Sequence, residues 1–340
     1  MDLTTVLGEP SSPLLPLCPS LPPIRIRKRK RPSIKNLDDL INFYYNMDDE
    51  EYEDRLDLKI LHSIINPLLD LDNMVGLKKI KEEIMHLVMY YLQQLNDPHE
   101  MLHTVISGPP GCGKTMLGRI LGRLYTALLK KPSNKFRIVH RTDFIAKYLG
   151  QTAHRTKNLL EECCGGVMFL DEAYGMASRK DDNDSYSKEA LDTLNQFLSD
   201  HCDDFVCIIA GYREELEKTF FAQNPGLQRR FPWHFTIENY DPPELAEIFE
   251  RMLNEISWQY AKEFSAEEWF QNHSKELPNL GGDCAVLLTK CKIAHTHRIF
   301  GQSRKLRRRL SQEDMDEGLA LFKATQKQRE SDRPPPGMYL

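Results

Sequence analysis

The chain has 340 residues, a formal net charge of −5 at pH 7 and a hydrophobic content of 41%. These values are ordinary for a globular protein, and no apolar run is long enough to cross a lipid bilayer, which excludes a membrane-spanning protein. A charge so close to neutral gives no global argument for nucleic acid or a membrane surface as the partner.

The N-terminal segment and the cysteines predict the compartment. The first residues lack the basic-then-apolar order of a secretory signal, because their apolar stretch comes first and is rich in proline. None of the eight cysteines forms a C-x-x-C pair, which favours buried thiols in a reducing compartment over zinc sites or disulfides. We therefore expect an intracellular protein, most simply a cytoplasmic one.

Proline and charge mark both ends of the chain as tails. Residues 1–56 are expected to form a disordered, proline-rich and basic tail, and residues 327–340 a second one. The first contains the basic cluster Arg25–Arg31. Such a cluster is typical of a nuclear-import signal or a nucleic-acid-binding arm, but equally of a solubilising run of charge. A nuclear location therefore stays an alternative to the cytoplasm.

Between the tails, apolar strands alternate with amphipathic helices. A helix is expected over residues 78–94. Five strands follow, at 102–107, 136–140, 167–171, 205–210 and 234–237, with helices at 116–130, 151–163 and 187–199. Short buried strands separated by helices predict an α/β fold with a parallel sheet sandwiched by helices, assigned to residues 57–240. Residues 241–326 carry only helical patterns and predict a small all-α lid.

The segment from Gly108 to Thr115 reads G-x-x-x-x-G-K-T between the first predicted strand and the next helix. This is the context of a phosphate-binding P-loop, in which backbone N–H groups and the positive end of a helix surround the phosphates. Lys114 is expected to reach the β- and γ-phosphates, and the Thr115 hydroxyl to ligate Mg²⁺. The residues predicted to bind nucleotide here are Gly108, Pro109, Pro110, Gly111, Cys112, Gly113, Lys114, Thr115 and Met116.

Two adjacent carboxylates, Asp171 and Glu172, end the third predicted strand. Asp171 is expected to hold the hydration shell of Mg²⁺, and Glu172 to polarise a water for attack on the γ-phosphate. A kinase has no use for the second acid, so the pair predicts hydrolysis. Arg229 and Arg230 precede the last strand. An arginine near the γ-phosphate would stabilise the transition state, although spacing alone favours a surface pair.

In combination these motifs resemble the AAA+ ATPases, in particular the branch of red-type rubisco activase and stage V sporulation protein K. The resemblance covers most of the chain, from about Leu71 to Ala324. It rests on LDNMVGL at 71–77, the P-loop, FLDEAY at 169–174, IAGY at 209–212 and NPGL at 224–227. The lid run at 282–295 is similar to large-DNA-virus members of this branch.

The resemblance implies roles that spacing alone does not give. Val75 and Gly76 would contact adenine. Arg230 would be a finger that reaches into a neighbouring subunit's site, with Arg229 as the fallback. Tyr212 occupies the sensor-1 position, where many members carry Asn. The resemblance also implies ATP and Mg²⁺ as cofactors and a homo-oligomeric ring, most simply a hexamer.

The start of the last-but-one lid helix departs from the family pattern. A sensor-2 arginine is usual there, whereas this chain has Asp283 and Cys284. Lys290 or Lys292 would have to substitute from one turn or more further along the helix. The resemblance therefore does not extend to the arginine that would couple lid motion to hydrolysis.

The work done with ATP is predicted from Tyr148–Gly150, which matches the aromatic-apolar-glycine pore loop of AAA+ unfoldases. Tyr148 and Leu149 would grip an extended polypeptide, although a loop tyrosine packed on its own subunit explains the pattern equally well. We therefore expect a ring that remodels or unfolds an unidentified protein. The alternative is a nucleic-acid-associated switch, clamp-loader-like or helicase-like, supported by the basic clusters at 25–31 and 304–309. No helix-turn-helix or zinc module accompanies them.

Overall fold

The computed structural model describes residues 32–97, 99–129, 135–146, 151–176, 185–201 and 203–331. The chain divides into two units, Met1–Ser33 and Ile34–Leu340, and the elements below belong to the second. No helix among the described residues is long and apolar enough to span a membrane.

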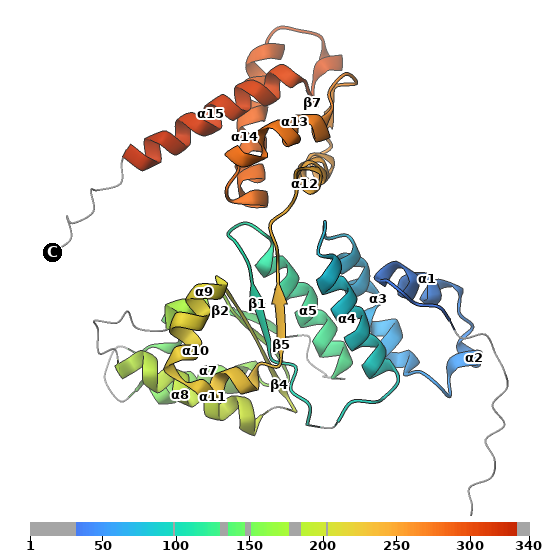
Figure 1. Ribbon diagram of the computed structural model, residues 1–340, viewed down its shortest axis with the longest axis vertical. Coiled ribbons are helices and arrows are strands. Elements are labelled where there is room, and N and C mark those ends of the chain that lie inside the picture. The colour runs from blue at the N-terminus through green and yellow to red at the C-terminus, as the bar shows by residue number, and fades with distance from the viewer. Residues whose placement is uncertain are drawn as a thin grey trace, which may run out of the picture. The chain divides into compact units, whose positions relative to one another are not determined.

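The core of the second unit is a five-stranded parallel sheet (Figure 1). Its strands are β1 (Thr104–Ser107), β2 (Phe136–Val139), β3 (Gly166–Leu170), β4 (Phe205–Gly211) and β5 (Trp233–Thr236), in the order β2-β3-β4-β1-β5. Every residue of the three inner strands is buried, whereas the two edge strands are partly exposed. Burial on both faces accounts for the continuous apolar runs of β3 and β4.

Helices cover both faces of the sheet, and alternate residues of the strands face them. Phe169 and Ile208 belong to one hydrophobic cluster, with α3 (Leu58–Asp72), α4 (Lys78–Leu92) and α5 (Lys114–Leu128). Met168 and Ile209 belong to the other, with α7 (Thr152–Cys163) and α8 (Ser185–Asp200). The remaining core elements are short: α6 (Arg141–Phe144), η1 (Ala173–Met176), α9 (Arg213–Glu215), η2 (Leu216–Phe220), α10 (Phe221–Gln223) and α11 (Pro225–Arg230). The predicted sandwich is confirmed.

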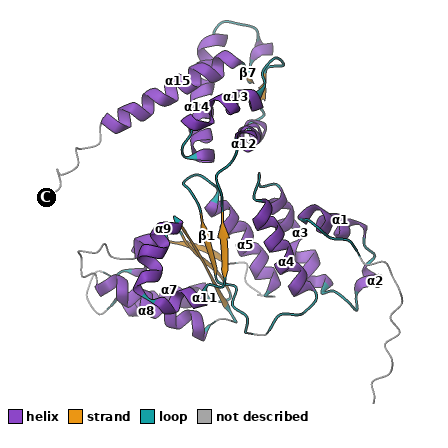
Figure 2. Ribbon diagram, viewed as in Figure 1, coloured by secondary structure: helices purple, strands orange, loops and turns teal. Residues whose placement is uncertain are grey.

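The C-terminal region is a helical lid, as Figure 2 shows. It contains α12 (Pro242–Glu255), α13 (Ala266–His273), η3 (Ser274–Glu276), α14 (Leu280–Ile299), η4 (Arg304–Leu306) and α15 (Gln312–Ser331). The expected helical lid is confirmed, and it also contains one short parallel pair, β6 (Gln259–Tyr260) and β7 (Arg309–Leu310). Two residues are too few to show a strand period in a sequence.

The N-terminal boundary also differs from the prediction. Within the range 1–56, expected to be disordered, the structure forms α1 (Leu37–Asn46) and α2 (Asp49–Tyr52). Asn36 caps α1 by accepting from the Asp39 N–H at 2.8 Å. Leu37, Leu40 and Ile41 are buried in the same cluster as α3 and α4, so a short apolar stripe orders this acidic segment. The Arg25–Arg31 cluster lies outside the described residues, as does most of the predicted C-terminal tail, while α15 extends to Ser331.

Candidate nucleotide-binding site

The loop between β1 and α5 has the backbone geometry of a phosphate-binding turn. Gly111 and Gly113 have φ of 70° and 91°, in the left-handed region that favours glycine. Gly113 is the N-cap of α5 and has no side-chain capping bond. The first N–H groups of a fifteen-residue helix therefore open onto the loop, where an anion would be stabilised by these donors and by the helix dipole.

Lys114 lies over this loop. Its Nζ donates to the carbonyl oxygens of Gly108 at 3.0 Å and Pro109 at 2.6 Å. It also lies 5.1 Å from the centre of the Tyr212 ring, within the range of a cation–π interaction. The ammonium is thus held beside the glycine-rich turn by contacts that a phosphate oxygen can replace.

Oxygen atoms from the P-loop and from the end of β3 meet beside Lys114. The Thr115 Oγ1 donates to Asp171 Oδ2 at 3.0 Å. Glu172 directly follows and is exposed, with φ of 51°, and its N–H donates to Asp171 Oδ1 at 3.0 Å. Hydroxyl and carboxylate oxygens suit Mg²⁺. The structure therefore brings together Thr115, Asp171 and Glu172, as the sequence predicts.

Two stacked tyrosines form one wall of this site. The rings of Tyr174 and Tyr212 are 5.4 Å apart and inclined by 18°. Burial, together with the nearby Glu172 carboxylate, raises the pKa of Tyr174 to about 12. Both tyrosines line a cavity of about 310 Å³ with the loop residues 110–116 and the two carboxylates. Tyr174 is a site residue that the sequence reasoning missed, although it lies in the FLDEAY segment.

A second, mainly apolar cavity of about 750 Å³ adjoins the loop and has room for a nucleoside. From the core it is lined by Met74, Val75, the loop residues Gly111–Gly113 and Met116, and from the lid by Ile248, Met252, Gly281 and Gly282, among others. Tyr240 also lines it and donates from its hydroxyl to the Cys112 carbonyl oxygen at 2.8 Å. Burial raises the pKa of Tyr240 to about 12 and also raises that of the Cys112 thiol. Both groups are therefore neutral at pH 7.

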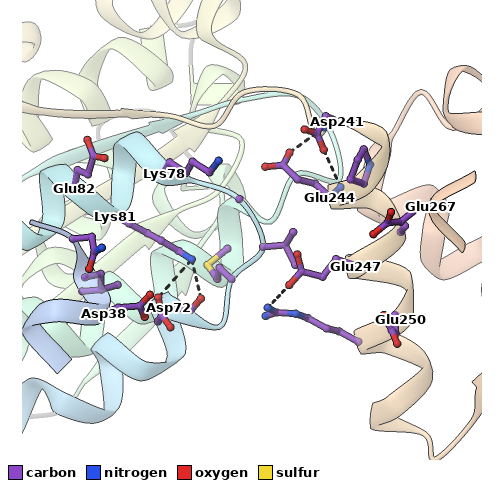
Figure 3. A pocket seen from close by; sticks show the side chains of 18 of the residues that line it. Asp38, Asp72, Lys78, Lys81, Glu82, Asp241, Glu244, Glu247, Glu250 and Glu267 are labelled. Atoms are coloured by element: carbon purple, nitrogen blue, oxygen red, sulfur yellow. Dashed lines mark hydrogen bonds and ion pairs between the residues drawn. The ribbon is translucent and has the colours of Figure 1, made fainter. Parts of the chain in front are cut away.

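Gly76, predicted to contact adenine with Val75, lies where the apolar cavity meets a neighbouring one. A Cβ at Gly76 would be 2.5 Å from Glu244 Oε1. Gly76 lines this neighbouring cavity of about 760 Å³, which shares Met74 and Val75 with the apolar cavity and whose wall is rich in carboxylates (Figure 3). There the Lys81 ammonium donates to the Asp72 carbonyl oxygen at 2.8 Å, and burial lowers the pKa of Lys81. An excess of carboxylates repels phosphate, so the apolar cavity and the P-loop are the better nucleotide site.

Comparison with known proteins identifies the family. The family model described as "ATPase family associated with various cellular activities (AAA)" matches residues 104–236. A CfxQ-like protein of Acanthamoeba polyphaga mimivirus is 33% identical over 324 residues, which are 94% of this chain and 78% of that protein. The chain belongs to the AAA family of ATPases.

Other relatives specify the branch and the fold. The chloroplastic ribulose bisphosphate carboxylase/oxygenase activase of Cyanidioschyzon merolae is 32% identical, over 68% of this chain and 82% of that protein. Stage V sporulation protein K of Bacillus subtilis is 32% identical, over 59% of this chain and 64% of that protein. The crystal structure of the FIGL-1 AAA domain in complex with ADP has a TM-score of 0.53 at 17% identity, covering 76% of this chain and 89% of that domain. The predicted AAA branch and ATPase activity are confirmed.

In this AAA fold the lid meets the P-loop at the start of α14. A Cβ on Gly111 would lie 2.0 Å from the Asn279 carbonyl oxygen and 2.7 Å from the Gly282 nitrogen. Asp283 is buried and accepts from the Asn279 N–H at 2.8 Å, so it caps its own helix and does not face the nucleotide. Neither Lys290 nor Lys292 lines the two cavities that the described residues form at the loop.

The two arginines of α11 differ in their surroundings. Arg230 is half-buried: its Nε donates to Ser199 Oγ at 2.5 Å and its Nη1 to the Gly226 carbonyl oxygen at 2.8 Å. Arg229 is exposed. The resemblance favours Arg230 as the finger, whereas exposure favours Arg229. The predicted pore-loop residues Tyr148 and Leu149 lie outside the described residues.

Proposed function

We propose that this AAA ATPase is a Mg²⁺-dependent, ring-forming protein remodeller. Hydrolysis is supported above all by one observation: Thr115, Asp171 and Glu172 lie close together beside Lys114. The relatives support the remodelling part, since one is named an activase of another enzyme. Hydrolysis then serves to change the conformation of a protein partner.

The proposed chemistry assigns each side chain one task. Mg²⁺, when bound through Thr115 and Asp171, would neutralise charge on the β- and γ-phosphates. When nucleotide binds, the Lys114 ammonium would donate to phosphate oxygens in place of the Gly108 and Pro109 carbonyl oxygens. Glu172 lies next to the Mg²⁺-associated acid but is exposed, so its carboxylate is available to accept a proton from the attacking water. Tyr212, from the adjacent strand end, shields the site with Tyr174.

A neighbouring subunit is proposed to complete the site through α11. Among the described residues, the lining of the 310 Å³ cavity beside Asp171 and Glu172 supplies no cation other than Lys114, and γ-phosphate cleavage is accelerated by an arginine. In a ring, most simply a hexamer, Arg230 would reach the next subunit's nucleotide after exchanging its bonds to Ser199 and Gly226. Arg229 would reach it without that exchange.

A nucleic-acid-associated role is the second candidate, favoured by one observation. Residues 304–309 are all exposed in the lid, and five of these six are basic: Arg304, Lys305, Arg307, Arg308 and Arg309. Such a segment binds phosphate backbones with little sequence preference. The acidic cavity of Figure 3 and the net charge of −5 argue against a general affinity of this unit for nucleic acid.

One experiment separates the two candidates. ATP hydrolysis is measured with no addition, with an unfolded polypeptide, and with single- or double-stranded DNA or RNA. Stimulation by the polypeptide, lost in Tyr148→Ala but kept in Tyr45→Ala at an exposed tyrosine of α1, supports remodelling. Stimulation by nucleic acid alone, lost when Arg307 and Arg308 are changed to Ala, would instead establish the second candidate.

The hydrolytic assignment has its own test. Glu172→Gln is expected to bind ATP normally and to reduce turnover by roughly 100-fold or more. Glu162→Gln, at an exposed glutamate of α7, is the matched control. If Glu172→Gln hydrolyses ATP at the normal rate, Glu172 is not the base. Mixing Glu172→Gln subunits with Arg229→Ala or Arg230→Ala subunits then shows which arginine acts in trans, because only that mixture regains activity at shared interfaces.

A further inference from the structure

The opposite edge of the sheet holds a cluster of metal-ligating side chains that the ATPase chemistry does not use. Cys164 lies directly after α7, His201 directly after α8, and Asp204 directly before β4. Their candidate ligand atoms, the thiol sulfur, a ring nitrogen and a carboxylate oxygen, all lie within 4.8 Å of one another. Each side chain is partly exposed, so an ion can reach it from solvent.

The parallel sheet itself brings these residues together. β3 and β4 are neighbours with Gly166 opposite Phe205, so the segments that enter the two strands run side by side at the amino edge. The nucleotide cavity, with Asp171, Glu172 and Gly211, lies at the carboxyl edge of the same strands. The two sites are therefore separated by the length of the strands, and the cluster takes no part in binding the nucleotide.

The backbone around the cluster is fixed by hydrogen bonds. The Gly165 N–H donates to the Asp204 carbonyl oxygen at 2.6 Å, which joins the Cys164 turn to the segment before β4. The His201 carbonyl oxygen accepts from the Asp204 N–H at 3.3 Å and the Phe205 N–H at 3.0 Å. The His201 ring stacks on Phe197, with centroids 4.1 Å apart and planes inclined by 21°. These contacts hold the backbone of the cluster and the His201 ring in place, which reduces the cost of ordering a metal site.

The spacing of the side-chain atoms suits a small tetrahedral ion. Ligand atoms about 2.0–2.3 Å from a tetrahedral Zn²⁺ lie roughly 3.5 Å from one another. His201 Nδ1 and Asp204 Oδ1 are already 3.5 Å apart, and this contact is not among the hydrogen bonds found between described residues. The Cys164 sulfur lies within 4.8 Å of both, and its S–H contacts the Leu160 carbonyl oxygen at 3.7 Å, so binding of the ion replaces this contact by a sulfur–zinc bond.

We propose that Cys164, His201 and Asp204 bind one Zn²⁺, with water as the fourth ligand. Sulfur, imidazole nitrogen and carboxylate oxygen are together a zinc-type donor set, whereas Mg²⁺ and Ca²⁺ prefer oxygen alone. On binding, the Cys164 S–H bond is replaced by a sulfur–zinc bond and one proton is released to solvent. The ion joins the ends of α7 and α8, so its role is to stabilise the core.

The test uses the full chain, stripped of metal and saturated with Mg²⁺ and ADP so that the P-loop site is filled. Zn²⁺ is expected to bind with a stoichiometry of one and to raise Tm. Co²⁺ in its place is expected to give the absorption of a tetrahedral cobalt–thiolate centre. Cys164→Ser abolishes the thiolate band, and His201→Ala or Asp204→Asn weakens Zn²⁺ binding by about 100-fold or more. ADP affinity is unchanged in all three variants.

The neighbouring residues provide controls. Cys163→Ala removes the adjacent thiol, which is buried in the core, and Asp203→Asn changes the adjacent carboxylate, which contacts His99 at 2.9 Å. Both variants are expected to keep the cobalt–thiolate band. A band that persists in Cys164→Ser, or that is lost in Cys163→Ala alone, overturns the assignment. So does an absence of stoichiometric Zn²⁺ binding by the wild-type chain.

Discussion

His103 is a buried histidine whose protonation we expect to destabilise the ATPase core. It directly precedes β1, and its side chain is inaccessible to solvent. Nδ1 accepts from the Cys207 N–H at 3.1 Å, so the ring proton is on Nε2, which donates to the Leu198 carbonyl oxygen at 3.2 Å. A second ring proton on Nδ1 would face the Cys207 N–H, and the hydrogen bond from this residue of β4 to His103 would be lost.

The size of the effect follows from the pKa of this group. Burial lowers the pKa of His103 from 6.5 to about 4; the Leu198 bond opposes this shift and the Arg230 charge adds to it. The neutral ring thus contributes its full stability above pH 6.5, where the unfolded chain is also neutral, and loses it as the pH falls from 6.5 towards 4. At about 1.36 kcal/mol per pKa unit the complete loss is about 3 kcal/mol, of which about 2 kcal/mol falls between pH 7 and pH 5.

Urea unfolding of the wild type and of His103→Gln, measured between pH 7 and pH 5, tests this reasoning. A glutamine side chain can accept from Cys207 and donate to Leu198 but does not titrate, so the variant should lose about 2 kcal/mol less than the wild type over this range. His86→Gln, at an exposed histidine of α4, is the control and should follow the wild type. If His103→Gln and the wild type have the same pH dependence, the buried neutral ring is not the cause.

Three further predictions concern the loop, the arginines and the lid. Gly111→Ala places a Cβ at φ 70° against the Asn279 carbonyl. ATP affinity, measured by calorimetry, should therefore fall about tenfold or more from strain alone. Gly175→Ala, with nothing within 4 Å of its Cβ, is the control and should bind ATP normally. Arg230→Ala should lower the free energy of unfolding by about 1–3 kcal/mol, because two hydrogen bonds are lost. Arg229→Ala should change it by less than about 0.5 kcal/mol. Equal stabilities of the two variants would contradict the different surroundings of these arginines. Burial alone would raise the pKa of Asp314, but Arg298, Ser311 and His295 lower it on balance, so its stabilising contribution is present above about pH 4 and is lost in acid. Asp314→Asn should therefore destabilise the lid at pH 7 by about 3 kcal/mol and flatten the acid limb of its unfolding curve, and an unchanged acid limb would disprove the role of this carboxylate.

The sheet and the phosphate site could be predicted because their signals are local. Each inner strand is a short apolar run, and each strand end that carries chemistry is marked by adjacent residues: Gly113–Thr115 after β1 and Asp171–Glu172 after β3. Once parallel order is assumed, those ends must meet at one edge. The meeting of Thr115 with Asp171 therefore required no knowledge of side-chain packing.

The other features depend on contacts between distant segments. The buried stripe of α1 is too short to outweigh its acidic composition in a sequence analysis. Asp283 accepts from the Asn279 N–H and so caps α14, a contact that the family motif alone does not show. Cys164 and His201 are brought together only by the pairing of β3 with β4. The role of Tyr148, the ring and the cellular location stay predictions.

The last turn of α8 connects three of these features. The Leu198 carbonyl oxygen accepts from His103, and the Ser199 hydroxyl accepts from Arg230. The first contact is made by a backbone carbonyl and the second by a side chain, so this turn is held both by the residue that precedes β1 and by α11. His201 follows within the same turn of chain, and a zinc ion bound there would hold it from a third side. Because all three contacts lie away from the P-loop, the zinc site should act on the stability of the arginine segment and not on nucleotide affinity.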